Sequence, residues 1–189
     1  MSLIGIVAVQ GAFAAHAKVL AAMGHETALV RHPRDLGENV EGLIFPGGES
    51  TVQLGLIADL ELEAPLRAFV ASGKPVLATC AGLILLAAHV RNPAQRSLGA
   101  IDVTVARNAW GRQVESFEAT SDAGAPLVFI RAPRIIEVAP DVEILDRYLG
   151  EPILVHQRNV TAATFHPELG GSRSVHEAWS LRIARRRGA

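Results

Sequence analysis

The stretch between residues 75 and 88 constrains the fold of this chain more than any other. Residues 75–79 are short, mostly apolar and preceded by Gly73, which is typical of a buried strand. Residues 83–88 contain strong helix formers and no helix breaker, which predicts a buried helix. Cys80, the only cysteine in the chain, lies at the junction, so we expect a sharp strand-to-helix turn with a thiol at its apex.

Small residues surround this thiol. Ala78, Ala81 and Gly82 allow a sharp turn and let backbone N–H groups approach the sulfur. The positive end of the following helix favours the thiolate, which is the nucleophilic form of cysteine. A lone cysteine in an apolar run is also commonly a small buried core residue. Cys80 by itself is therefore compatible with both interpretations.

Composition limits the classes of protein to which the chain can belong. Its 189 residues predict one domain, residues 1–189, with a full core. A net charge of −1 provides no field for nucleic acid or an anionic membrane, and the longest apolar-rich run, residues 76–90, is too short to span a bilayer. One cysteine excludes an internal disulfide and most cysteine-based metal sites. We expect neither a metal nor a cofactor. The unpaired thiol and the absence of a basic region before the first apolar run predict a cytoplasmic protein.

Strand and helix patterns alternate through the first half of the chain. The expected strands are residues 3–9, 26–30, 40–45 and 75–79, and the expected helices are residues 12–23, 50–58, 60–71 and 83–88. Such alternation predicts a parallel sheet with helices on both faces. Ligand sites in these sheets lie beyond the carboxyl ends of the strands. Because Gly47, Gly48 and Cys80 all follow strands, we expect them to face one crevice.

The pattern changes near residue 98. Short β-rich segments joined by turns predict antiparallel hairpins added to the sheet, at residues 98–105, 113–119, 127–130, 135–138 and 142–148. Residues 153–157 and 160–165 predict a final hairpin that ends beside His166. Residues 173–187 predict a closing helix.

His166 and Glu168 are candidates for the base and the acid that a cysteine nucleophile needs. In an extended chain, residues two apart point to the same side, so the carboxylate can orient the imidazole. Pro167 stiffens the segment. The same residues are also compatible with a strand end followed by an ordinary turn.

Residues 47–50 form a glycine turn that leads into a helix. Its backbone N–H groups, together with that of Ala81, can receive a developing oxyanion. The segment lacks the Gly-Lys-Ser/Thr ending of a P-loop and the G-x-G-x-x-G pattern, which argues against a phosphate-binding loop. An ordinary turn, in which Ser50 or Thr51 caps the helix, remains an alternative.

Arg107 and Arg131 follow apolar strands and can hold a carboxylate, although most arginines are solvated.

Together these motifs resemble the class I, triad-type glutamine amidotransferases. The resemblance is carried by Ala-Thr-Cys-Ala-Gly at 78–82, Pro-Gly-Gly-Glu-Ser-Thr at 46–51 and Phe-His-Pro-Glu at 165–168. Further motifs resemble one family in this class, the glutaminase subunits of pyridoxal 5′-phosphate synthase. They are Val-Gln-Gly-Ala at 9–12 followed by His16, Arg107-Asn108, Gly111-Arg112-Gln113, Ser-Phe-Glu at 116–118 and Phe-Ile-Arg-Ala-Pro at 129–133. The motifs occur in order between residues 3 and 169.

The resemblance implies a three-layer, flavodoxin-like α/β sandwich with a mostly parallel central sheet and added antiparallel strands. It implies that L-glutamine is hydrolysed to glutamate and ammonia through a thioester on Cys80, with His166 as base and then acid and Glu168 orienting His166. The implied glutamine contacts are Gly47, Gly48, Glu49, Arg107, Ile130 and Arg131, and the implied oxyanion hole is the N–H groups of Gly48 and Ala81.

The resemblance also implies a partner. In this family ammonia passes to a separate (β/α)8-barrel synthase subunit, which makes pyridoxal 5′-phosphate from ammonia, a pentose phosphate and a triose phosphate. The glutaminase is weak until that partner docks, and the assembly is a large hetero-oligomer. The chain departs from the family at Ala78, where glycine is usual, and at Trp110, where phenylalanine or tyrosine is usual. No role is carried over beyond Glu168.

Three alternatives remain open. The same triad could serve another acceptor, such as imidazole glycerol phosphate synthase, although Gln10-Gly11 and residues 130–133 argue against this. Protease-like or chaperone-like cysteine hydrolases commonly place histidine directly after the cysteine, where this chain has Ala81. A non-catalytic regulatory subunit is the non-enzymatic alternative, and the complete set of triad residue types argues against it.

Overall fold

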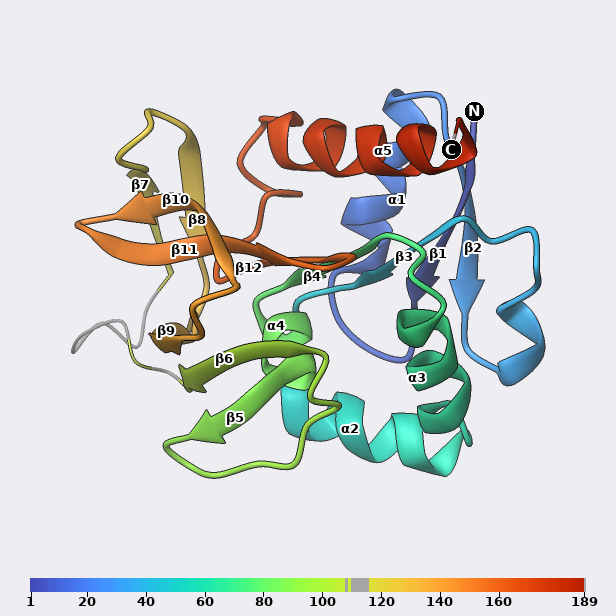
Figure 1. The fold of residues 1–189 in the computed structure, drawn as a ribbon, viewed down its shortest axis with the longest axis horizontal. Coiled ribbons are helices and arrows are strands. Elements are labelled where there is room, and N and C mark those ends of the chain that lie inside the picture. The colour runs from blue at the N-terminus through green and yellow to red at the C-terminus, as the bar shows by residue number, and fades with distance from the viewer. Residues whose placement is uncertain (108, 110–115, 189) are drawn as a thin grey trace.

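A seven-stranded sheet forms the centre of the computed structural model, which describes residues 1–107, 109 and 116–188 (Figure 1). Its strands are β1 (Leu3–Val7), β2 (Glu26–Val30), β3 (Gly42–Phe45), β4 (Val76–Thr79), β10 (Glu143–Tyr148), β11 (Glu151–Gln157) and β12 (Val160–Ala163). The spatial order is β10-β11-β12-β4-β3-β1-β2. The pairs from β12 to β2 are parallel, whereas β11 is antiparallel to both of its neighbours. The predicted mostly parallel sheet and the final hairpin are therefore confirmed.

Helices cover both faces of this sheet. They are α1 (Phe13–Ala22), α2 (Ser50–Asp59), α3 (Glu63–Ala71), α4 (Ala81–Leu86) and α5 (Ser174–Arg187), and a 3-10 turn, η1 (Pro33–Asp35), follows β2. Figure 1 shows α1 and α5 on one face and α2, α3 and α4 on the other, which confirms the three-layer arrangement. Within the described part of the chain, no helix is both long enough and apolar enough to cross a membrane.

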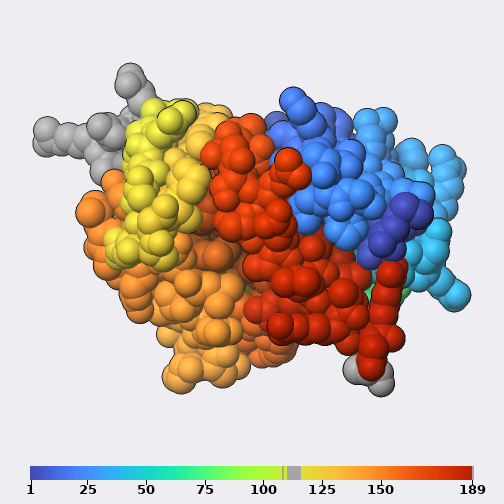
Figure 2. All heavy atoms as spheres, turned by 90° about the horizontal axis from the view of Figure 1, so that it is seen from above, coloured from blue at the N-terminus to red at the C-terminus, as the bar shows by residue number. Residues whose placement is uncertain are grey.

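Side chains of β1 alternate between the hydrophobic clusters on the two faces of the main sheet. Ile4 and Ile6 pack with Trp179 and Ile183 of α5 in the cluster on one face, while Val7 belongs to the larger cluster on the other. Alternation of side chains across the strand accounts for this division. Figure 2 views the α5 face, where the red C-terminal residues lie across the middle of the molecule.

The remaining strands form two small sheets. They are β5 (Ala87–Arg91), β6 (Ile101–Ala106) and β9 (Arg134–Val138) in one sheet, and β7 (Phe117–Thr120) and β8 (Pro126–Phe129) in the other. The prediction that all late β-rich segments extend the main sheet was therefore wrong for β6, β7, β8 and β9, and β5 was not predicted. The physical reason is that their apolar side chains pack onto hydrophobic clusters away from the edges of the main sheet. Val103 and Val105 belong to the cluster that includes Ile57 of α2, Leu66 of α3 and Leu83 of α4, and Phe129 packs with Phe165.

Two local predictions also differ from the structure. The helix predicted at 83–88 runs from Ala81 to Leu86, and Ala87 begins β5. The backbone N–H groups of Leu98 and Ala100 donate to the carbonyl groups of Leu85 and Leu86, at 2.6 and 2.7 Å. The segment at 98–100 therefore bonds the last carbonyl groups of α4, and the helix ends there.

The cap of α2 is Glu49, which replaces the predicted Ser50 or Thr51. Its carboxylate accepts the Val52 N–H at 2.6 Å. Glutamate reaches this N–H because the residue adopts an extended backbone, with φ −102° and ψ 110°, directly before the helix. A carboxylate is also favoured at the positive end of a helix.

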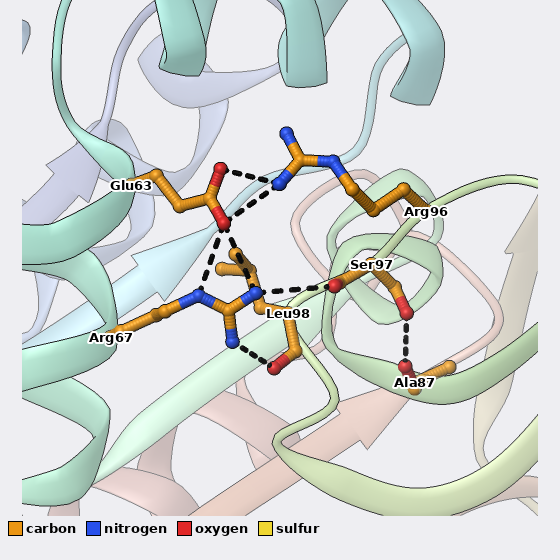
Figure 3. Close-up of polar contacts among 6 residues, drawn as sticks. All are labelled: Glu63, Arg67, Ala87, Arg96, Ser97 and Leu98. Carbon is orange, nitrogen blue, oxygen red and sulfur yellow. Dashed lines mark hydrogen bonds and ion pairs between the residues drawn. The ribbon is translucent and has the colours of Figure 1, made fainter.

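A cluster of polar contacts fixes the segment between β5 and β6 onto α3 (Figure 3). Glu63 contacts Arg67 at 3.1 Å and Arg96 at 2.7 Å. Arg67 also donates to the Leu98 carbonyl at 2.6 Å, and the Ser97 hydroxyl donates to the Ala87 carbonyl at 2.6 Å. These half-exposed ion pairs contribute about 0.2–1 kcal/mol each, so their main effect is to set the position of the segment.

We expect Trp179→Ala to destabilise the protein by about 3–5 kcal/mol, because it removes the largest buried side chain of the α5 face and leaves a cavity. The midpoint of urea unfolding, followed by circular dichroism, measures this. Leu181→Ala on the same helix is the control, since Leu181 is 56% exposed and the change should stay within about 0.5 kcal/mol. Equal losses for the two variants would contradict the packing described here.

Candidate active site

A pocket of about 270 Å³ lies beyond the carboxyl ends of β1, β3, β4 and β12. Its lining includes Gly47, Gly48, Glu49, Cys80, Arg107, Ile130, Arg131 and His166, all of which the sequence singled out. Gln10, Ala12, Ser50, Ile84 and Leu169 complete it. Of the other two predicted residues, Glu168 is buried beside His166, and Ala81 is buried in the first turn of α4. The expected crevice is present at the expected edge of the sheet.

Cys80 occupies a strained turn between β4 and α4. Its φ of 48° and ψ of −103° are unusual for a residue with a side chain. Its N–H donates to the Ala163 carbonyl of β12 at 2.9 Å, and its thiol lies 3.8 Å from the Ile130 carbonyl. A Cβ atom at Gly82 would lie 2.1 Å from the Phe45 carbonyl oxygen, so the turn needs glycine there. Ala78 lies inside β4, where alanine fits an extended backbone.

His166 and Glu168 are in direct contact. His166 Nδ1 lies 2.7 Å from Glu168 Oε1, and both residues are buried. The segment has left β12 and forms a turn, in which the Leu169 N–H bonds the His166 carbonyl at 3.2 Å. The turn and the histidine–carboxylate contact, which the sequence left as alternatives, therefore occur together.

The electrostatics of this group favour a charged imidazole. Burial opposes the charge on His166, but hydrogen bonds with Cys80 and Glu168 outweigh burial and raise the pKa of His166 to about 10. Burial likewise opposes ionisation of Glu168, yet the hydrogen bond from His166 holds the pKa of Glu168 below its usual value. Because Nδ1 is in contact with Glu168, Nε2 is the nitrogen left for the hydrogen bond with Cys80.

The loop at 46–49 is held in place from several sides. The Glu49 N–H donates to Gln10 Oε1 at 2.9 Å, and the Gly47 N–H donates to Thr79 Oγ1 at 3.1 Å. Gln53 donates to the backbone carbonyls of Gln10 and Pro46, at 2.9 and 3.2 Å. Gln10, a weak signal in the sequence, thus directly positions the candidate oxyanion loop.

Close approach explains the glycines of this loop. A Cβ atom at Gly47 would lie 2.2 Å from His166 Cε1, and one at Gly48 would lie 2.4 Å from Gln10 Oε1. Gly11 has φ +104°, and its Cβ would lie 2.0 Å from the Gly47 carbonyl oxygen. Real Cβ atoms do not approach their neighbours this closely, so the three glycines let the loop, the first strand and the imidazole meet.

Charged groups of both signs lie at the pocket. Arg107 Nη2 lies 3.1 Å from Glu49 Oε1. Burial opposes ionisation of Glu49, but the N–H groups of α2 and the charge of Arg107 hold its pKa below the usual value. Arg131 is exposed and has φ 46°. Asn108, Trp110 and the motif at 111–113 lie outside the described residues.

Sequence reasoning gave no role to three buried residues behind the site, His16, Thr79 and His176. His16 lies three and four residues from Phe13 and Leu20, and His176 lies three and seven residues from Trp179 and Ile183. This helical spacing places each histidine on an apolar face and could have identified it.

Among residues 1–107, 109 and 116–188, no group of three or more His, Cys, Asp or Glu could hold a metal ion.

Known proteins resemble this chain along most of its length. Pyridoxal 5′-phosphate synthase subunit PdxT of Koribacter versatilis is 51% identical over 179 residues, 92% of this chain and 92% of the relative. The protein of the same name from Thermotoga maritima is 45% identical over 179 residues, 92% of this chain and 95% of the relative.

Solved structures agree with this likeness. The structure titled "Crystal structure of glutamine amidotransferase" superposes with a TM-score of 0.88 at 40% identity, over 96% of this chain and 98% of that chain. PurLQS from Thermotoga maritima has a TM-score of 0.64 at 16% identity over 92% of this chain and 91% of its own, which shows a shared fold alone. The family match spans residues 6–184, and this chain therefore belongs to the SNO glutamine amidotransferase family.

Proposed function

We propose that this chain hydrolyses L-glutamine to L-glutamate and ammonia and supplies the ammonia to a pyridoxal 5′-phosphate synthase. The observation that carries the proposal is the convergence of Cys80, His166 and Glu168 at one pocket. Membership of a glutamine amidotransferase family and relatives named as pyridoxal 5′-phosphate synthase subunits support the substrate and the destination of the ammonia.

In the first half of the reaction, the Cys80 thiolate attacks the side-chain amide carbon of glutamine. The carbonyl π electrons move onto oxygen, and the N–H groups of Gly48 and Ala81 stabilise this oxyanion. The His166 imidazolium gives its proton to the amide nitrogen. The carbon–nitrogen bond breaks, ammonia leaves, and a thioester on Cys80 remains.

In the second half, neutral His166 takes a proton from water as the water oxygen attacks the thioester carbon. Collapse of this second tetrahedral intermediate breaks the carbon–sulfur bond and releases glutamate. The thiolate and the imidazolium are restored. Glu168 accepts from Nδ1 throughout and stabilises the charged ring, as its 2.7 Å contact with His166 requires.

The charges around the pocket suit a free amino acid. Glu49 can pair with the substrate ammonium group, while Arg107 and Arg131 can pair with its carboxylate. The Ile130 carbonyl faces the thiol, and Gly47 lies against the imidazole, so both residues border the reacting carbon.

The ammonia acceptor is a separate synthase subunit with a (β/α)8-barrel fold, and the two chains act in a large hetero-oligomer in the cytoplasm. Residues 1–189 act as a single glutaminase domain. The names of the relatives favour this acceptor over imidazole glycerol phosphate synthase. The complete triad argues against a non-catalytic regulatory subunit.

We expect Cys80→Ala to lower glutamate release by at least about 1,000-fold, because the variant has no nucleophile. The measurement is glutamate formed from glutamine after adding purified synthase subunit. Wild-type chain with and without the synthase is the control, and the thermal midpoint shows that the variant is folded. Unchanged glutamate release from Cys80→Ala would refute the assigned nucleophile.

We expect Gly47→Ala to lower kcat by about 100-fold, because the new methyl group displaces the His166 ring from its productive position. Gly55→Ala is the matched control, since a Cβ atom there meets nothing within 4 Å. That control should keep its activity and gain about 0.5–1 kcal/mol of stability from better helix propensity. Full activity in Gly47→Ala would contradict the close approach of residue 47 to His166.

We expect Glu168→Gln to move the alkaline limb of the kcat–pH profile to lower pH. The Glu168 carboxylate raises the pKa of His166, so the amide variant loses the imidazolium at lower pH than wild type, whose His166 has a pKa of about 10. Glutamate release with the synthase present, measured from pH 6 to pH 10, checks the direction. An alkaline limb that stays in place or moves upward would exclude Glu168 as the partner of His166.

A further inference from the structure

Two buried histidines lie behind the triad and take no part in the proposed reaction. His16 on α1 and His176 on α5 are both fully buried. His16 Nδ1 lies 2.9 Å from His176 Nε2, and His16 Nε2 lies 3.2 Å from Thr79 Oγ1 and 3.4 Å from Glu168 Oε2. A continuous row of polar side chains therefore leads from α5 through α1 to Glu168.

The Glu168 carboxylate needs a second donor. Its Oε1 is in contact with His166 Nδ1, whereas Oε2 is buried and has no hydrogen-bond partner among the described residues. An unsatisfied buried oxygen on a charged group is costly. His16 Nε2 lies 3.4 Å from Oε2, a contact that is not yet a hydrogen bond in this structure, and a rotation of the His16 ring would supply the donor.

Both histidines are neutral near pH 7. Burial lowers the pKa of His16, against a smaller opposing effect of Glu168. Burial also lowers the pKa of His176, to about 4. A neutral imidazole has one N–H donor and one acceptor nitrogen, so the direction of each hydrogen bond depends on the tautomer.

Only two arrangements fit the His16–His176 contact. If His16 carries its proton on Nδ1, its Nε2 lone pair faces the Glu168 carboxylate, and His176 is left with a proton on Nδ1, which has no partner among the described residues. If His16 carries its proton on Nε2, the carboxylate gains a donor and His176 leaves only an acceptor unpaired. Buried N–H groups without partners are rarer than unsatisfied acceptors, so both ends of the row favour the second arrangement.

We propose that His16 is a positioning residue for Glu168, donating from Nε2 to Oε2, and that His176 sets this tautomer by donating from Nε2 to His16 Nδ1. The inference rests on the proposed function of the triad. Donors at both oxygens fix the plane of the carboxylate, so that Oε1 stays directed at His166. Thr79 shares the Nε2–H of His16 and also holds the Gly47 N–H, which couples the row to the oxyanion loop.

We expect His16→Phe to lower kcat by about 10- to 100-fold, the range for loss of one hydrogen bond to a charged group, and to leave KM within about twofold. KM is spared because His16 acts through Glu168 and touches no substrate. His16→Gln, whose amide keeps a donor, should recover most of kcat. The assay is glutamate release by the chain together with the synthase subunit.

The matched control is His156→Phe. His156 is buried on β11 and contacts Thr161 Oγ1 at 3.0 Å, so the change removes another buried histidine away from the pocket and should leave kcat unaltered. A kcat for His16→Phe within about twofold of wild type would overturn the proposal. A His16→Gln variant no better than His16→Phe would overturn it as well.

A spectroscopic measurement separates this proposal from the proposed function. In the ¹⁵N-histidine-labelled wild-type chain, long-range ¹H–¹⁵N spectra at pH 7 should show His16 and His176 neutral and protonated on Nε2. Any other state of His16 would overturn the assignment, even if His16→Phe fails to fold. If the wild-type chain with synthase releases no glutamate, the proposed function fails, and the spectrum still decides the direction of the His16 hydrogen bond.

Discussion

The parallel pairing of β4 with β12 is the constraint on which the site depends. In this register Thr79 lies opposite Ala163, and the Cys80 N–H bonds the Ala163 carbonyl at 2.9 Å. Two segments that are distant in the chain therefore leave the sheet side by side, one with the thiol and the other with the imidazole. Side chains alternate between the two faces along a β-strand. A shift of one of these strands by one residue would therefore turn the group that it carries away from the pocket.

The close packing around this edge limits which residues can occupy it. A non-glycine residue in the conformation of Cys80 costs of the order of 1–3 kcal/mol, which the surrounding contacts must offset. Gly11, Gly47 and Gly82 let backbone and ring atoms approach within distances that a Cβ atom would forbid. Cys80 is buried, yet this turn places it in the lining of the pocket, which distinguishes it from a cysteine enclosed in the core.

Behind the pocket, polar groups replace apolar packing between α1, α5 and the sheet. His16, Thr79, Glu168 and His176 sit among the apolar residues of that layer, where unpaired polar atoms are costly. They are tolerable there because each bonds or closely approaches the next. The layer that stabilises α5 on the sheet thus also reaches the carboxylate that contacts His166.

The sequence alone determined the strand–helix alternation, the turn at Cys80, the glycine loop, the order of the motifs and the family, because these depend on residues that are neighbours in the chain. It did not determine that Ala87 begins β5, that Glu49 caps α2, or that β5–β9 form separate sheets. Nor did it place His16 and His176 behind Glu168. These outcomes depend on which backbone and side-chain groups meet through space, and only the register of the sheet and the packing of α1 and α5 decide that.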